Sequence, residues 1–472
     1  MVNATDFIDK LYSTLAELLN VDESSQSMFI QMAWPGYSLS PADFKPGGSP
    51  NSAYDKDIAK EVFSSLANMA PTFNKTKFEN SGYEIDDLYE ILIASAIPVG
   101  ATPDTIGTNP MNRLFSDAQF ELTQARRGSK SDPNLFYYPC GATPGNWYDE
   151  IAAQSWPTIS IKSADIKPIN KPTPIFREPN GHRDIWKLRP TRIDSTVLKS
   201  KLQQTVNLKA DKEKQQLQLF QSKLGGLSKR AIAPTLKTKP LDANIAKATR
   251  SLSPSARKRS TTSATLLTPS ATPEFSKTLA QARNTAVFKT KSTPINILSN
   301  SKFKANLQNI TVSPQTLELK AAKDLSFSQK VLATELLNQQ LETKPVSTTT
   351  NGYSLSFKFC RVNISRSWFK LALLSNKNWY MFNTATQEYS TGSADDNPGM
   401  FPLLPISFIA IRDLKITANW SQEDKKNLDR AVSFGPFDLR HRTINNNTLE
   451  VKGLQIIAWV SRLMPPLPPT QA

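Results

Sequence analysis

The stretch ISFIAIRDLKITANW, residues 406–420, predicts a long β-strand in the C-terminal region of the chain. Its first half is apolar on both faces, and its second half is apolar only at alternate positions. Alternation with a period of two is typical of a half-buried strand. We therefore expect a strand that leaves a core midway along its length, with one face formed by Phe408, Ala410, Leu414, Ile416 and Trp420.

Two adjacent charged residues, Arg412 and Asp413, interrupt this strand. Consecutive residues of a strand point to opposite faces, so these two side chains cannot simply pair with each other. Burying either ion alone would cost several kcal/mol, so each needs a partner or water. Two interpretations are open. The strand emerges into solvent at this point, or the two residues belong to a buried ion pair or an interface.

The sequence around this strand repeats the strand pattern. Bulky residues alternate between 353 and 364, and two further strands are predicted over 431–439 and 449–460. Gly435 and Gly453 mark bends or bulges in the last two. We expect residues 349–472 to form an antiparallel β domain with sandwich-like packing and a proline-rich tail.

The first third of the chain has the period of helices instead. Apolar residues recur at helical spacing in four segments, and proline or glycine follows the last three of them. The predicted helices cover residues 5–19, 58–69, 84–95 and 114–126. We expect residues 1–160 to form a mostly helical domain.

Positive charge is concentrated in the middle of the chain. The protein has 57 Lys+Arg and 41 Asp+Glu, a formal net charge of +16, and residues 162–344 alone contain 33 basic and 12 acidic residues. This region is rich in Ser, Thr and Pro, and it has too few large apolar groups to offset a chain entropy of about 1–2 kcal/mol per residue. We expect residues 161–348 to be a largely extended or disordered basic connector with one or two isolated helices, over 194–224 and 315–342. The whole is then a multidomain α+β protein.

Two short basic clusters are candidates for contact with a polyanion or an acidic protein partner. One lies in the connector and the other at the end of a predicted strand; they are Arg257, Lys258 and Arg259, and Arg440, His441 and Arg442. Neutralising phosphates would make such binding strongly dependent on salt. Single-strand binding also needs aromatic residues among the basic ones, and the connector largely lacks them. The alternatives are a plain flexible linker for the first cluster and a solvated patch for the second.

The chain ends in a proline-rich tail. Arg462, Pro465 and Pro468 have the R-x-x-P-x-x-P spacing of a polyproline II ligand, in which two prolines enter aromatic grooves and the arginine meets an acid. Because the tail follows a strand directly, the alternative is a lid that lies over the β domain.

No motif in the chain indicates catalysis, a cofactor or a metal. The 17 glycines form no phosphate-binding loop, and no Cys-x-x-Cys pair is present. Neither His182 nor His441 has a partner at metal-ligand spacing, and Cys140 and Cys360 are expected to be ordinary thiols. Three adjacent carboxylate pairs are expected to be solvated surface; they are Asp86-Asp87, Asp149-Glu150 and Asp395-Asp396.

These features predict a non-enzymatic structural or interaction protein that tethers two partners, or two parts of a large assembly, through the basic connector. The alternative is a polyanion-binding protein, with nucleic acid as one candidate ligand, and an enzyme with an unmarked site in the β domain comes third. The N-terminus lacks a signal-peptide pattern, and the longest apolar stretch, 401–411, is too short to span a membrane. We therefore expect a cytoplasmic protein without a membrane span; export without an N-terminal signal is the alternative.

Overall fold

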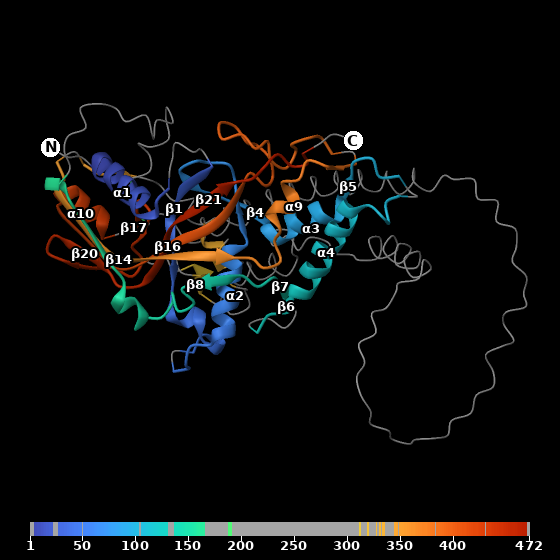
Figure 1. Ribbon diagram of the computed structural model, residues 1–472. Helices are drawn as coiled ribbons and strands as arrows, with labels where there is room; N and C mark the ends of the chain where they lie inside the picture. Colours follow the sequence, from blue (N-terminus) through green and yellow to red (C-terminus); the bar gives the residue numbers. More distant parts are fainter. Residues whose placement is uncertain are drawn as a thin grey trace, which may run out of the picture. The chain divides into compact units, whose positions relative to one another are not determined.

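A nine-stranded sheet, antiparallel except for one short pairing, organises the protein (Figure 1). The structure is a computed structural model that describes residues 4–21, 27–49, 51–102, 105–130, 136–165, 187–190, 311–312, 319–320, 327, 330–331, 333–335, 344–347, 349–382, 384–429 and 431–469. All of them fall in one compact unit that takes in both ends of the chain, Met1–Gln216 and Ser292–Ala472. The predicted mixed α+β class is confirmed, whereas the sandwich-like packing stays a prediction.

The central strand of the sheet is β16, which pairs with β14 along one edge and with β21 and β20 along the other. From β21 the sheet continues to β1 and then β3, from β20 to β19, and from β14 to β8 and β9. The strands are β1 (Met28–Leu39), β3 (Lys77–Phe78), β8 (Gly141–Thr143), β9 (Thr158–Lys162), β14 (Asn351–Ser365), β16 (Leu403–Asn419), β19 (Thr443–Asn445), β20 (Thr448–Val451) and β21 (Leu454–Leu463).

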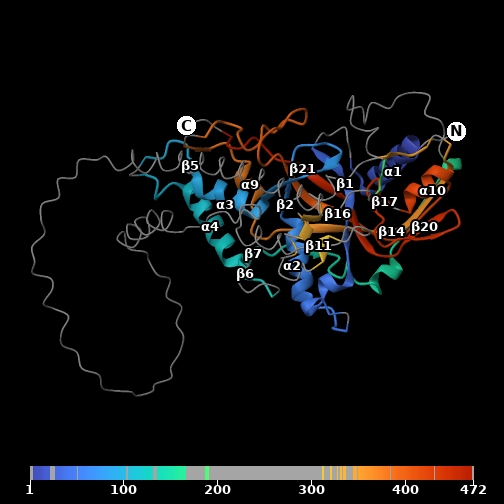
Figure 2. The ribbon, with the colours of Figure 1, turned by 180° about the vertical axis from the view of Figure 1, so that it is seen from behind.

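Both ends of the chain build this sheet, which corrects our expectation of two separate terminal domains. Strand β1 pairs with β21 from Met28 opposite Arg462 to Leu39 opposite Leu454, and the two strands lie side by side (Figure 2). Strand β9 pairs with β14, with Lys162 opposite Ser354. Residues from both ends also share one hydrophobic core cluster. The predicted segments 1–160 and 349–472 therefore fold together.

Strand β1 was not predicted because it lacks the alternation of a half-buried strand. Most of its residues are buried regardless of parity, and it contains Pro35 and Gly36 at a shift in register between Met32 and Tyr37. Only glycine fits at residue 36, since a Cβ there would lie 2.5 Å from the carbonyl oxygen of Pro436. The Gly36 N–H donates to that same oxygen at 2.8 Å. Periodicity cannot reveal such a strand.

The four predicted N-terminal helices are confirmed. Asp55 caps the second of them, since its side chain accepts from the N–H groups of Asp57 and Ile58. The helices are α1 (Ala4–Leu19), α2 (Lys56–Ala67), α3 (Ile85–Ser95), α4 (Pro110–Ala125), α9 (Leu371–Leu374) and α10 (Gln422–Leu428), with short 3-10 turns η2 (Pro41–Phe44), η3 (Pro46–Gly48), η4 (Ala152–Ser155) and η5 (Ser163–Asp165).

The remaining strands form five small sheets. Four are two-stranded: β2 (Met69–Pro71) with β4 (Asn80–Glu84), β5 (Ala96–Pro98) with β15 (Trp379–Met381), β6 (Arg127–Gly128) with β7 (Phe136–Tyr137), and β11 (Thr311–Val312) with β12 (Leu319–Lys320). The fifth has the order β13 (Lys344–Pro345), β10 (Lys187–Pro190), β17 (Ala431–Phe434) and β18 (Phe437–Asp438). The segment predicted as one strand over 431–439 is therefore a hairpin, β17–β18, which turns at Gly435.

A bulge in β16 changes which residues share a face. On β16 three steps separate Arg412 from Lys415, whereas only two separate their partners Lys358 and Ser356 on β14. The extra residue keeps Ile409, Ile411, Leu414, Ile416 and Ala418 together in one core cluster with Leu11 and Leu15 of α1. Phe408 instead contacts Phe63 of α2 and Trp147 on the opposite face. Our prediction that Phe408 and Ala410 share a face with Leu414 is therefore wrong, because the bulge reverses the alternation.

The predicted basic connector lies mostly outside the described residues, as does the predicted helix over 194–224. Of the described residues within the predicted helix over 315–342, residues 327, 330–331 and 333–335 are helical, whereas residues 319–320 belong to strand β12, so the prediction is wrong at that point. Within the described ranges, no helix is both long enough and apolar enough to cross a membrane.

Candidate functional site

The two ends of the basic region are fixed next to each other. Strand β10 pairs with β13, with Lys187 opposite Pro345 and Leu188 opposite Lys344, and β10 also pairs with β17 through Leu188 and Phe434. In sequence, residues 191–343 therefore lie between two strands that pair with each other. We call residues 191–343 the basic insertion and the rest of the chain the body; the paired strands β10 and β13 form the neck of the insertion.

This division separates the charge of the protein completely. The basic insertion contains 25 basic and 9 acidic residues, and the body contains 32 of each. The net charge of +16 therefore belongs to the insertion, while the body is neutral. The candidate residues Arg257, Lys258 and Arg259 belong to the insertion and lie outside the described residues.

The second candidate cluster, Arg440–Arg442, lies in the body and is engaged in structural contacts. Arg440 donates from Nε to Asp438 Oδ2 at 2.7 Å, and their side chains are 10% and 1% exposed. Arg442 donates from Nη1 to the carbonyl oxygens of Ala431 and Leu439 at 2.7 and 3.0 Å. Burial lowers the pKa of Arg442, and His441 is exposed. Both guanidinium groups thus bind residues of β17, β18 and the segment after β18. A polyanion contact at this cluster stays a prediction.

The proline-rich tail packs against the body. Leu467 is fully buried, its N–H donates to the Ser390 oxygen at 2.8 Å, and its own oxygen accepts from the N–H of Tyr389 at 2.8 Å. Pro468 is also buried, while Arg462 is exposed at the end of β21. These contacts favour the lid over the polyproline II ligand, and the latter stays a prediction.

The charged residues Arg412 and Asp413 have separate partners on the two sides of the bulge. Arg412 is 7% exposed and donates to the Tyr148 oxygen at 2.9 Å and to Glu150 Oε1 at 3.4 Å. Asp413 has a backbone φ of +54° and pairs with Lys358 at 3.3 Å. Arg412 is thus a buried ion-paired residue, and Asp413 belongs to the surface.

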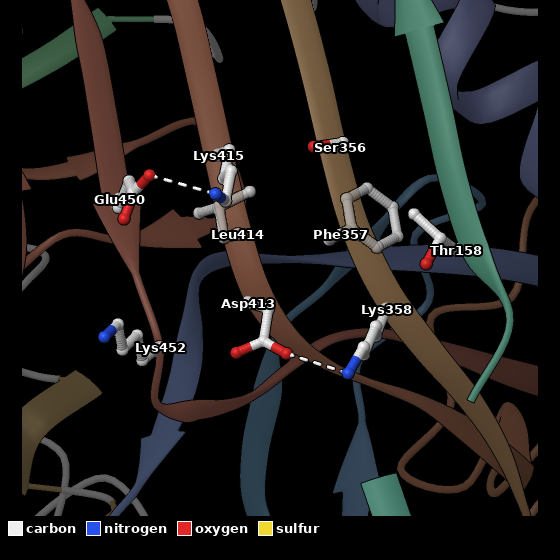
Figure 3. A pocket seen from close by; sticks show the side chains of 9 residues that line it. All are labelled: Thr158, Ser356, Phe357, Lys358, Asp413, Leu414, Lys415, Glu450 and Lys452. Carbon is white, nitrogen blue, oxygen red and sulfur yellow. Dashed lines mark ion pairs between the residues drawn. The ribbon is translucent and has the colours of Figure 1, made fainter. Parts of the chain in front are cut away.

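Asp413 belongs to a surface groove with a volume of about 450 Å³ (Figure 3). Strands β9, β14, β16 and β20 supply most of its wall, including Ser356, Lys358, Lys415 and Glu450. Sequence analysis named none of these four, because only the register of the strands brings them together.

One segment of the basic insertion returns to the body. Val331 is 8% exposed and Ala333 is fully buried, and Glu335 Oε1 accepts from the Asn80 N–H at 3.4 Å. Burial, and next the charge of Glu335, raises the pKa of Tyr37, which also hydrogen-bonds this carboxylate. The predicted docking helix therefore contacts the protein itself.

Sequence analysis wrongly assigned Asp86 to solvated surface. Its side chain is 4% exposed, and burial raises the pKa of its carboxyl group to about 7, although the Arg366 guanidinium acts in the opposite direction. Asp395 is 84% exposed as predicted, and Glu150 is exposed but paired. Asp86 lies on the buried side of helix α3. The residues next to it in sequence did not indicate this burial.

The thiols are not poised for nucleophilic attack. Burial raises the pKa of Cys140 to about 12 and that of Cys360 to about 11, so both are protonated at neutral pH. The described part of the chain contains no group of three side chains that could hold a metal ion. His182 lies outside it.

Comparisons of this chain with protein-family models, with curated proteins and with solved structures found no match. Its function has to be inferred from its own residues.

Proposed function

We propose that this protein is a non-enzymatic interaction protein of a larger assembly, in which the body binds one partner and the basic insertion binds another. The observation that carries the proposal is the separation of charge at the neck: the insertion has a net charge of +16, and the body has none. This retains the predicted tethering role and replaces the two tethered terminal domains with one body and one insertion.

The neck supports this division of labour. One end of the insertion is held by pairing of β10 with β17 and the other by pairing of β13 with β10, so a ligand on the insertion is confined near the body. Confinement raises the effective concentration of the second partner without any new contact. A chain that used its positive charge for folding would have matched it with buried or neighbouring carboxylates. The body is balanced in this way, and the insertion is not.

A second candidate function is polyanion binding by the insertion alone. It is favoured by the excess of 25 basic over 9 acidic residues and by the run Arg257–Arg259. The engagement of Arg440 and Arg442 with Asp438, Ala431 and Leu439 makes the body the weaker polyanion site. Binding of this kind would lose affinity steeply as salt rises. An enzyme is the third candidate, and it rests on no residue that we can name.

Deleting the insertion tests both candidates. In the variant, residues 191–310 are replaced by a flexible Gly/Ser linker, which keeps the returning segment around Glu335. We expect retention on immobilised heparin to fall to near the level of a neutral protein, because 17 net positive charges are removed. Unchanged retention would contradict a role for the insertion in either function.

Affinity capture separates the two candidates. We expect the full chain to capture two groups of partners and the deletion variant to keep one of them. If the deletion variant captures none of the partners of the full chain, the body is no docking element, and simple polyanion binding is favoured. A scrambled insertion of the same composition is the matched control, since it keeps charge and length but changes any specific motif.

A further inference from the structure

The groove of Figure 3 lies on the open face of the sheet. Residues of β14, β16 and β20 alternate here, with Leu355, Leu414 and Leu449 turned to the core. Their neighbours Ser356, Lys415 and others face outward and line the groove. A concave volume of about 450 Å³ is within the range of small-molecule sites. This half of the sheet therefore presents a concave surface that combines charged and hydroxyl side chains with the apolar Phe357 and Leu414.

Charges of opposite sign alternate across the groove. Lys358 pairs with Asp413 at 3.3 Å, and Lys415 pairs with Glu450 at 3.1 Å. Lys452 has no ion pair with any residue in the described part of the chain, and it is exposed. The groove thus has a balanced set of donors and acceptors and one additional cation.

The backbone at Asp413 adopts a left-handed conformation within the bulge. Its φ of +54° is uncommon for a residue other than glycine. A bulge can place one residue in this conformation, and aspartate tolerates it better than most residues do. The carboxylate lies beside Lys358 on the wall of the groove (Figure 3). Bulges often re-aim a side chain next to a binding site.

The alternating charges of the groove disfavour polyanions and favour ligands with many hydroxyl groups. A polyphosphate or nucleic-acid backbone would find only Lys452 available, because Asp413 and Glu450 already neutralise Lys358 and Lys415. A ligand with many hydroxyl groups can donate to these carboxylates and accept from the lysines and from the hydroxyls of Ser356 and Thr158. One negative group on such a ligand would match Lys452.

We propose that this groove binds a small polyhydroxylated ligand with a single carboxylate, of the class of acidic sugars, and that Lys452 pairs with the carboxylate. The site does not depend on the proposed function of the insertion, because every residue that lines it belongs to the body. Asp413 and Glu450 accept from ligand hydroxyls, and Lys358 and Lys415 hold these two carboxylates in place.

Calorimetric titration of the full chain with a disaccharide of galacturonic and galactose units tests the proposal. We expect this probe to bind, and the neutral galactose disaccharide to bind at least tenfold more weakly. Lys452→Gln should weaken binding of the acidic probe about tenfold, and Lys452→Arg should restore most of it. Lys425→Gln, at an exposed lysine of α10, is the matched control and should change nothing. No binding of the acidic probe, or equal binding by Lys452→Gln, would overturn the proposal.

Asp413→Asn distinguishes sugar recognition from simple attraction of anions. Asparagine tolerates a positive φ, so the bulge is expected to persist. The variant should bind the acidic disaccharide several-fold more weakly, because an acceptor for ligand hydroxyls becomes weaker. If binding instead becomes stronger, the groove is an anion patch and the proposed ligand class is wrong. Heparin retention, which tests the insertion, should be the same in this variant and in the parent chain.

Discussion

The body and the basic insertion use charge in opposite ways. In the body 32 basic and 32 acidic residues balance, and the buried Asp438 is paired with Arg440. In the insertion 25 basic residues face only 9 acidic ones. The body reaches this balance although it is assembled from both ends of the chain. The comparison teaches that the whole net charge of the protein lies in the insertion.

The largest effect is expected where the two ends of the chain meet in the body. Phe408 is fully buried and contacts Phe63, Trp147 and Trp459. Phe408→Ala should lower the free energy of unfolding by about 3–5 kcal/mol. Chemical denaturation followed by tryptophan fluorescence and by circular dichroism should give one shared transition. Loss of the C-terminal strands with the N-terminal helices intact would contradict a common core, and Ile444→Ala, at a side chain that is 38% exposed, is the control.

A buried ion pair in the body should also have a large effect. Asp438→Asn leaves the Arg440 cation buried without its carboxylate, and this kind of loss costs about 3–5 kcal/mol. Asp395→Asn is the matched control, since Asp395 pairs with Lys75 at 3.5 Å but is 84% exposed, and such pairs contribute about 0–1 kcal/mol. Equal thermal stability of the two variants would argue against structural use of charge in the body.

The pH dependence of stability provides a third test. Asp86 has a folded-state pKa of about 7, against a usual value of 3.8, mainly because of burial. The folded state therefore binds more protons than the unfolded state between about pH 4 and pH 7, and stability should fall as pH rises through this range. Asp86→Asn should flatten the dependence and raise the melting temperature at pH 8. A melting temperature that rises from pH 5 to pH 7 in the parent, or an unchanged profile in the variant, would contradict this.

The smallest effect on stability is expected in the insertion. Replacing Arg257, Lys258 and Arg259 together by glutamine should change the free energy of unfolding by less than about 0.5 kcal/mol. The same change should lower the salt concentration at which the protein leaves heparin, because three phosphate-pairing charges are lost. Thermal melts and salt elution of one preparation measure both. A large loss of stability would place these charges in the fold and would break the distinction between body and insertion.

Sequence alone predicted the four N-terminal helices and strands β14 and β16, because their apolar residues keep a regular period. The single strand predicted over 449–460 is wrong, since β20 ends at Val451 and β21 begins at Leu454. Strand β1 was not predicted, because it is buried on both faces and is interrupted at Gly36. The bulge at Asp413 was not predicted either. A single added residue in β16 can be recognised only when the register with β14 is known. The groove depended on the register of the strands, since Lys358, Lys415 and Glu450 come from three different strands. The features that sequence analysis missed depend on pairing between distant segments of the chain, and local propensity does not report such pairing.

The neck explains why the division of the chain was misjudged. Composition correctly marked a basic middle region, and two flanking segments with globular composition suggested two domains. Leu188 of β10 lies opposite Lys344 of β13. No local sequence pattern predicts a pairing of only two residues. The basic middle region is therefore an insertion into one body, rather than a connector between two domains.

Cutting the insertion once tests the common body most directly. A recognition sequence for a specific protease, inserted after residue 260, would allow the native chain to be cut into two fragments that carry the N-terminal and C-terminal segments. We expect the fragments to elute together in size-exclusion chromatography, with the circular dichroism of the uncut chain, and to separate only in denaturant. Two fragments that separate in native buffer and each keep a folded spectrum would contradict the shared sheet.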